Sequence, residues 1–328
     1  MKAIVQDRYG APEVLRLAEV DEPVTGDDDL LVRVHAASLN ARDWHVMRGD
    51  PYLARAMPSA DGGLRAPKSA IRGTDFAGRV VSVGPNVTRF RPGDEVFGEV
   101  RSAFAEYVRV PEHLAEPVPA GLTLEQAAAI PLAANTALLG LRDAAQVRPG
   151  RRVLINGASG GVGTFAVQIA KSLGAEVTAV CSTRNVDLVG TLGADTVIDY
   201  TRTDFTRGGG RYDVLFDLVG NRSLADCLRA VTPTGTLVLS GGGVSEGGSL
   251  FGPIGLIIKA QLASRFVRPR VVVLAATPSR ENLAALRELA EAGAMTPVID
   301  RTYPFERTAE AIEYLEGEHA RAKVVVTL

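Results

Sequence analysis

The chain has 328 residues, of which 46% are hydrophobic and 23% are charged, which is typical of a globular protein long enough to bury two cores. Its 36 basic and 38 acidic side chains give a formal net charge of -2, so we expect neither a nucleic acid nor a membrane as a partner. The N-terminus shows no secretory signal pattern and the apolar run at residues 251–258 is too short to span a bilayer, so we expect a cytoplasmic protein.

The first 122 residues predict a compact antiparallel β unit, because short alternating segments are separated by Gly and Pro turns such as residues 91–94. A helix at residues 279–292 and a strand at residues 322–327 are expected to return to this unit, so residues 278–328 are assigned to it. The strands expected in the first unit are residues 30–36, 76–83, 95–97 and 105–110.

A glycine-rich turn, Asn-Gly-Ala-Ser-Gly-Gly-Val-Gly at residues 156–163, joins an apolar strand at residues 152–155 to an amphipathic helix at residues 164–171. Glycine permits positive φ and close approach of a pyrophosphate, and the helix N-terminus offers unpaired N–H groups. The turn therefore predicts dinucleotide binding, although such a turn can also be purely structural. The predicted contacts are Gly157, Ser159, Gly160, Gly161, Val162 and Gly163.

A second apolar strand at residues 176–181 completes the β-α-β unit, and Ser182, Thr183 and Arg184 follow it directly. An NAD site usually places an acidic residue directly after this strand to bind the ribose 2′-OH, but residues 182–186 include no Asp or Glu, and the first carboxylate after the strand is Asp187. Two hydroxyls and a guanidinium suit a 2′-phosphate, so the segment favours NADPH. Alternatively, a hydroxyl of this segment only caps the following helix.

The alternation of strands and helices continues, so residues 123–277 are predicted to form a six-stranded doubly wound parallel sheet, an α/β fold. Ligands of such sheets lie beyond the carboxyl ends of the strands, which places Leu218, Val219 and Gly241 beside the nicotinamide half of the cofactor. Glycine there is equally explained by turn formation. The remaining strands are expected at residues 196–200, 214–217, 236–240 and 271–275.

Five segments carry a family resemblance: ASLNARDW at residues 37–44, GTDFAG at 73–78, RPGDEV at 91–96, the glycine turn, and LGADTVIDY at 192–200. Through them the chain resembles the medium-chain dehydrogenase/reductase superfamily over nearly its full length, in the zinc-free quinone oxidoreductase-like branch. The resemblance implies a GroES-like domain and a Rossmann domain, hydride transfer with a nicotinamide cofactor, and a homodimer.

The chain departs from the zinc-dependent alcohol dehydrogenases of that superfamily. Where those enzymes place Cys, His-Glu and Cys around zinc, this chain has Asn40, the pair at residues 74–75, and Leu132. A zinc site needs several thiolate, imidazole or carboxylate ligands, and neither cysteine of this chain, Cys181 or Cys227, lies in a ligand position. We therefore expect no metal at this site.

Hydride addition without a Lewis acid favours substrates that are already electrophilic, such as quinones and carbonyl-conjugated alkenes. We therefore predict an NADPH-dependent, zinc-independent reductase of small electrophilic molecules. An enoyl-thioester reductase and a non-catalytic NADPH-binding structural or regulatory protein remain the alternatives.

The resemblance also implies residue roles. It places an Asn, here Asn40, and a Tyr slightly downstream beside the nicotinamide, but this chain has His45 at the downstream position and Tyr52 a few residues beyond. We expect these three residues on the substrate side, with His45 as a candidate acid and Tyr52 as a candidate hydrogen-bond donor.

On the cofactor side, the resemblance implies that Asn135 and Thr136 lie beside the nicotinamide, Tyr200 near the adenosine and Lys323 toward the phosphates. Structural alternatives stand beside these roles: Thr136 as a helix cap, Tyr200 as a strand-end anchor and Lys323 as a surface charge.

Overall fold

The computed structural model describes the chain except for residues 57–61, 241–252 and 318–319. It divides into two compact units. Unit 1 comprises Met1–Asn135, Thr277–Gly293 and Pro297–Leu328, and unit 2 comprises Thr136–Ala276 and Ala294–Thr296. The first boundary therefore follows residue 135 and not residue 122, because a short helix, α2 (Leu124–Ala128), packs against the sheet of unit 1.

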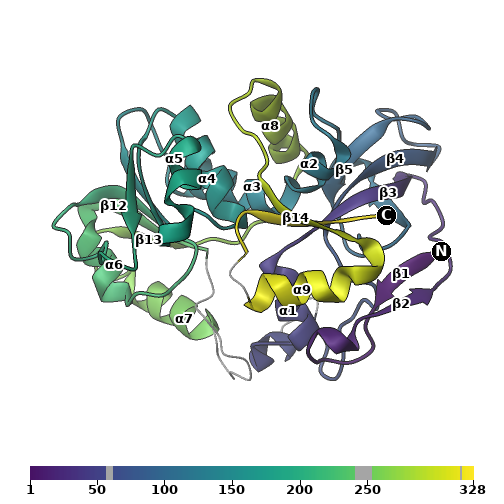
Figure 1. Cartoon of the computed structure of the whole chain (residues 1–328), viewed down its shortest axis with the longest axis horizontal. Helices are drawn as coiled ribbons and strands as arrows, with labels where there is room; N and C mark the ends of the chain where they lie inside the picture. The colour runs from purple at the N-terminus through teal and green to yellow at the C-terminus, as the bar shows by residue number, and fades with distance from the viewer. Residues whose placement is uncertain (57–61, 241–252, 318–319) are drawn as a thin grey trace. The chain divides into compact units, whose positions relative to one another are not determined.

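Unit 1 is built on a seven-stranded sheet in the order β14-β15-β3-β4-β5-β7, with β6 also paired to β3 (Figure 1). Its neighbours are antiparallel except for β14 and β15. The strands are β3 (Asp29–Leu39), β4 (Asp75–Val83), β5 (Glu95–Glu99), β6 (Tyr107–Pro111), β7 (Ala115–Pro117), β14 (Ile299–Pro304) and β15 (Lys323–Thr327), beside a hairpin of β1 (Lys2–Val5) and β2 (Arg16–Glu19).

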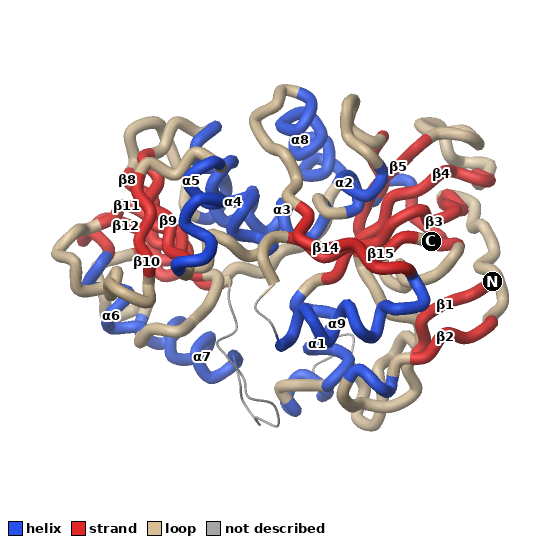
Figure 2. The backbone as a smooth tube through the Cα atoms, in the orientation of Figure 1, coloured by secondary structure: helices blue, strands red, loops and turns tan. Residues whose placement is uncertain are grey.

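Strand β3 is longer than the predicted segment at residues 30–36, because its last residues pair with β15, where Leu39 faces Val324. The C-terminal segment thus belongs to the core of unit 1, in which Phe76, Phe104 and Val326 are completely buried. The helices of this part are α1 (Ala41–Arg48), α3 (Pro131–Leu138), α8 (Arg280–Glu291) and α9 (Thr308–Gly317), of which α1 and α9 lie side by side (Figure 2).

Unit 2 confirms the predicted doubly wound sheet, with six parallel strands in the order β10-β9-β8-β11-β12-β13 among the described residues. Central strand β8 is buried on both faces, as its apolar run at residues 153–155 predicts. The strands are β8 (Arg152–Asn156), β9 (Glu176–Cys181), β10 (Thr196–Asp199), β11 (Tyr212–Asp217), β12 (Val231–Leu239) and β13 (Arg270–Val273), and the helices are α4 (Gly161–Ser172), α5 (Val186–Thr191), α6 (Leu224–Ala230) and α7 (Pro253–Ala263).

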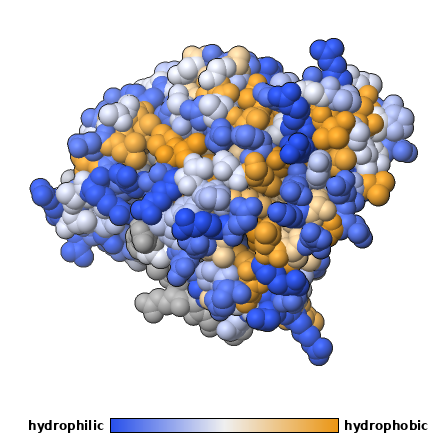
Figure 3. Space-filling model, turned by 45° about the vertical axis from the view of Figure 1, so that its right-hand side comes forward, coloured by the Kyte–Doolittle hydropathy of each residue, from blue (hydrophilic) through white to orange (hydrophobic). Residues whose placement is uncertain are grey.

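Hydrophilic side chains dominate the face drawn in Figure 3, with smaller apolar areas between them. Among the described residues, no helix is both long enough and apolar enough to cross a membrane.

Candidate active site

The glycine turn connects β8 to α4 as predicted, and two of its glycines are required by geometry. Gly157 has φ +87°, which disfavours other residues. A Cβ on Gly163 would lie 2.1 Å from the Gly157 carbonyl oxygen, because the helix packs directly on the turn. Gly160 is the N-cap and supplies no side chain, so the first N–H groups of α4, at Gly161 and Val162, are available to an anion.

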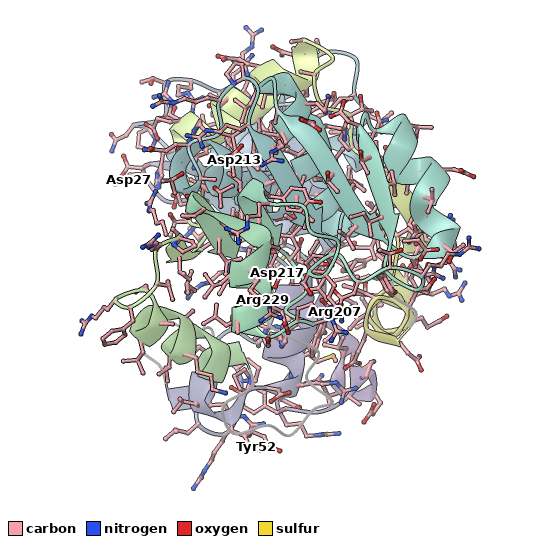
Figure 4. The ribbon with its side chains drawn as sticks, turned by 90° about the vertical axis from the view of Figure 1, so that its left-hand side faces the viewer. Asp27, Tyr52, Arg207, Asp213, Asp217 and Arg229 are labelled. Atoms are coloured by element: carbon pink, nitrogen blue, oxygen red, sulfur yellow. The ribbon has the colours of Figure 1, made fainter. Side chains whose placement is uncertain are left out.

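A second turn, at residues 217–220, is held against the glycine turn by Asp217 (Figure 4). The Asp217 carboxylate accepts from the Asn156 side chain at 2.8 Å and from the backbone N–H of Val219 at 3.1 Å. A Cβ on Gly157 would lie 2.6 Å from the Val219 side chain, so the structure brings these two predicted residues together, with Leu218 between Asp217 and Val219. The predicted residue Gly241 lies outside the described residues.

Asn185 joins the two serines that the sequence assigned to the cofactor. Its side-chain nitrogen donates to Ser159 Oγ at 3.0 Å and to Ser182 Oγ at 3.2 Å, which leaves both hydroxyl protons free for other acceptors. Its buried side-chain oxygen has no partner within the described ranges. The sequence analysis assigns Asn185 no role, although it follows Arg184 directly and so lies next to the predicted 2′-phosphate contacts.

The hydroxyl of Thr183, a predicted cofactor contact, already has a partner in unit 2. Its hydroxyl donates to the Asp199 carboxylate at 2.6 Å, so this proton is not free for a phosphate. Asp199 could not be assigned to this site from the sequence, because it lies on the next strand, β10. Only the pairing of β10 with β9 places it beside Cys181, at the end of β9. The hydroxyls of Thr183 and Thr201 lower the pKa of Asp199, which keeps it ionised. Arg184 is exposed, and Tyr200 is 40% exposed.

Asn135 and Thr136 are both buried in α3. The Asn135 side chain donates to the Thr277 carbonyl at 3.0 Å, and its own oxygen finds no partner within the described part of the chain. Thr136 lies inside the helix, so the alternative of a helix cap is wrong.

A polar cluster lies inside unit 1 around Asn40, the N-cap of α1. The Asn40 side-chain nitrogen donates to Asp75 at 3.0 Å and to Thr74 Oγ1 at 3.3 Å. The Asn40 backbone N–H donates to Asp43 at 2.7 Å, which completes a capping box. The three partners come from two segments that are both part of the family resemblance.

Lys323 completes the cluster, and it lies neither at the protein surface nor free to point toward a cofactor phosphate, the two positions expected from the sequence. It is only 2% exposed, and its ammonium donates to Asn40 Oδ1 at 2.5 Å and to the Leu39 carbonyl at 3.0 Å. The Asp75 carboxylate lies 3.6 Å away. Lys323 is therefore neither a surface charge nor free to reach a phosphate, because β15 carries it into the interior beside β3.

Burial dominates the electrostatics of the cluster. It raises the pKa of Asp43 to about 7 and that of Glu99 to about 8, where the guanidinium of Arg42, 3.7 Å from Glu99, only partly opposes the shift. Burial also raises the pKa of Asp75 and lowers that of Lys323, while the attraction between them opposes both shifts. The two groups thus act as a mutually compensated pair.

A small depression in unit 1 opens beside this cluster. Thr74 and Asp43 line it, and Asn40 is not among its lining residues. Three arginines, Arg42, Arg72 and Arg101, also line it. A hydroxyl and cationic side chains around a small space suit an oxygen that gains negative charge.

His45 and Tyr52 are not among the residues that line this depression. The His45 ring stacks on Trp44 and lies 3.3 Å from the Asp50 carbonyl, and burial lowers its pKa, so the ring is neutral at pH 7. Tyr52 is 44% exposed, with the Arg55 guanidinium 4.5 Å from its ring (Figure 4). Both side chains are therefore engaged by neighbours on their own segment.

The residues at the family's zinc position do not fit a zinc ion. Asn40, Thr74 and Leu132 supply no thiolate or imidazole, and the ammonium of Lys323 already lies against Asn40 and Asp75. In the part of the chain that the structure describes, no three His, Cys, Asp or Glu side chains are grouped to hold a metal.

Comparison with known proteins identifies both units. The alcohol dehydrogenase GroES-like domain family matches residues 26–120, and the zinc-binding dehydrogenase family matches residues 192–326. Two plant proteins are each 33% identical over 99% of this chain and 79% of their own length: a 2-methylene-furan-3-one reductase of Solanum lycopersicum and a chloroplastic NADPH-dependent alkenal/one oxidoreductase of Arabidopsis thaliana.

Among solved structures, the quinone oxidoreductase from Coxiella burnetii is 30% identical, with a TM-score of 0.86 over 100% of this chain and 99% of that chain. Fold and sequence therefore agree along the whole chain. The protein belongs to the medium-chain dehydrogenase/reductase superfamily, in its quinone oxidoreductase-like branch.

Proposed function

We propose that the protein is an NADPH-dependent oxidoreductase that reduces quinones or enones by hydride transfer. The observation that carries the proposal is the depression of unit 1, in which Thr74 and three arginines surround a space suited to a carbonyl oxygen. The names of the two plant relatives, a furanone reductase and an alkenal/one oxidoreductase, support this substrate class.

The cofactor site is supported by geometry as well as by the name of one relative. A Cβ would fill the cradle at Gly157 and Gly163, and Asn185 prepares the hydroxyls of Ser159 and Ser182 as donors. When bound, the cofactor supplies the hydride. We assign the pyrophosphate to the N-terminus of α4 and the 2′-phosphate to Ser182 and the exposed Arg184.

The residues of unit 1 explain why the substrate should already be electrophilic. Neutral donors and nearby cations stabilise charge on an oxygen less strongly than a directly bound metal, so the substrate must accept hydride readily. Quinones and enones do so, because the electron pair they gain is delocalised onto oxygen.

Loss of NADPH absorbance, followed with a panel of quinones, enones and enoyl thioesters, tests the proposal. We expect turnover of quinones or enones. Turnover confined to the thioesters would favour an enoyl-thioester reductase. Tight NADPH binding without turnover across the panel would favour a non-catalytic NADPH-binding protein and overturn the proposal.

We also propose a homodimer formed through β13. This strand lies at the edge of the sheet, and helix α7 packs beside it. Ile258, Leu262 and Phe266, in or just after α7, are 45%, 59% and 87% exposed, which is unusual for large apolar side chains. Light scattering on a sizing column should give a dimer that Phe266→Glu weakens; a monomeric wild-type protein would contradict this.

A further inference from the structure

We propose that the Thr74 hydroxyl donates the hydrogen bond to the substrate's carbonyl oxygen, and that Lys323, acting through Asn40, positions this hydroxyl. The inference rests on the proposed function and names the donor within that site. It replaces two roles expected from the sequence: substrate contact by Asn40 and phosphate contact by Lys323.

The orientation of the Asn40 side chain is fixed by its partners. A lysine ammonium can only donate, so the atom of Asn40 that lies 2.5 Å from Lys323 Nζ must be the oxygen. The nitrogen then points toward Asp75 and Thr74, at 3.0 and 3.3 Å. Both amide protons are thus used inside the cluster, so Asn40 has no proton left for a substrate.

The same bond determines what Thr74 can do. A hydroxyl has one proton, and the Thr74 oxygen already accepts from Asn40. Within the described ranges, that proton has no acceptor, although Thr74 is only 6% exposed. Thr74 is one of the residues that line the depression, so an oxygen bound beside this hydroxyl would meet a donor that Asn40 already orients.

The charges around the depression match the reaction. Hydride addition at the β-carbon of an enone moves the π-electron pair to the carbonyl oxygen, which stays negative until a proton from solvent reaches the α-carbon. Arg42, Arg72 and Arg101 line the space into which that charge would extend. Asp43 lines it too, but its carboxyl accepts the Asn40 backbone N–H and burial raises its pKa to about 7, so the three guanidinium groups outnumber it. The nearby Asp75 charge is compensated by Lys323 at 3.6 Å, which limits its repulsion of the developing oxyanion.

Substitution of Thr74 tests the donor. Thr74→Val removes the hydroxyl at nearly constant volume and should lower kcat for an enone by about 10- to 100-fold, because a preorganised donor is lost. Thr74→Ser should retain activity within about threefold, since it keeps the hydroxyl. Thr25→Val, a threonine elsewhere in unit 1, is the matched control. NADPH affinity should not change, and activity of Thr74→Val within twofold of wild type would overturn the proposal.

Substitution of Asn40 tests the positioning. Asn40→Asp keeps an oxygen for Lys323 but replaces the donor facing Thr74 by an acceptor, which should draw the Thr74 proton away from the depression. We expect a loss like that of Thr74→Val and little further loss when the two are combined. If the losses from Asn40→Asp and Thr74→Val instead add fully in the combined variant, Asn40 does not act through Thr74. The double substitution Lys323→Met with Asp75→Asn removes both charges. Added to Thr74→Val, it should cause no further loss of kcat for the enone.

A binding measurement separates this inference from the proposed function. Cyclohexanone, which carries a carbonyl but no conjugated double bond, is added to the protein saturated with NADP⁺, and its C=O stretch is recorded by infrared difference spectroscopy. The stretch should lie at lower frequency in wild type than in Thr74→Val. Equal frequencies would reject Thr74 as the donor even if enones are reduced. A shifted stretch without enone turnover would reject only the proposed function.

Discussion

The predicted sites of the two units are formed by different chemical groups. In unit 2, the glycine turn relies on backbone N–H groups and on the absence of side chains, within one stretch at residues 156–163. In unit 1, the cluster relies on buried charged and polar side chains at Asn40, Asp75 and Lys323, which are far apart in the sequence. A site made of backbone tolerates no added atoms, whereas a site made of buried charges depends on every partner.

Gly163→Ala should have the largest effect and tests the glycine-based site. The added Cβ would lie 2.1 Å from the Gly157 oxygen and 2.6 Å from the Ala158 carbonyl carbon, and backbone atoms cannot yield without moving the helix. We expect loss of NADPH binding and a strongly lowered Tm. Gly190→Ala in α5 is the control, because nothing lies within 4 Å of its added Cβ. A fully folded Gly163→Ala that binds NADPH normally would contradict the close packing.

Lys323→Met should destabilise the protein by about 3–5 kcal/mol, since it leaves the buried Asp75 without its counter-ion. Adding Asp75→Asn should recover much of this loss, because no unpaired charge then remains. Chemical denaturation of both variants measures the difference. An unchanged midpoint for Lys323→Met would show that the pair is not needed for stability.

Arg184→Ala should lower the preference for NADPH over NADH by about 10- to 100-fold, the range expected for one charge-assisted hydrogen bond. Arg202→Ala is the matched control, because Arg202 lies 3.6 Å from Asp199 and serves that carboxylate. Measured kcat/KM with both cofactors gives the ratio. An unchanged preference would remove Arg184 from the 2′-phosphate site and leave the position of Asp199 as an argument for NADH.

Glu99→Gln should have the smallest effect, and its size depends on pH. Because the pKa of Glu99 rises from 4.5 to about 8 on folding, the folded state binds more protons between these values, and stability falls as pH rises through this window. Glutamine does not titrate, so between pH 6 and pH 7 the variant should lose less stability than wild type, by about 1 kcal/mol. If the free energies of unfolding of wild type and Glu99→Gln change in parallel with pH, the pKa of Glu99 in the folded protein is near its ordinary value.

The sequence predicts the backbone-based site of unit 2 better than the buried side-chain cluster of unit 1. Residues that act through neighbouring backbone, such as Gly157 and Gly163, form a local pattern in the sequence, and the alternation of strands and helices around them is a local pattern too. Lys323 and Asp199 form no such pattern, because their partners come from other strands, and only strand pairing brings them together. Whether a side chain is buried also escapes the sequence, which is why Lys323 could be taken for a surface charge. The cytoplasmic location remains a prediction.

The most direct test uses NADPH carrying deuterium at the transferred position of C4, with an enone as substrate and mass spectrometry of the product. We expect one cofactor oxidised per product and deuterium on the former β-carbon of the saturated ketone. Oxidation of the cofactor without deuterium in the product, or tight binding with no product at all, would contradict hydride transfer to an activated double bond.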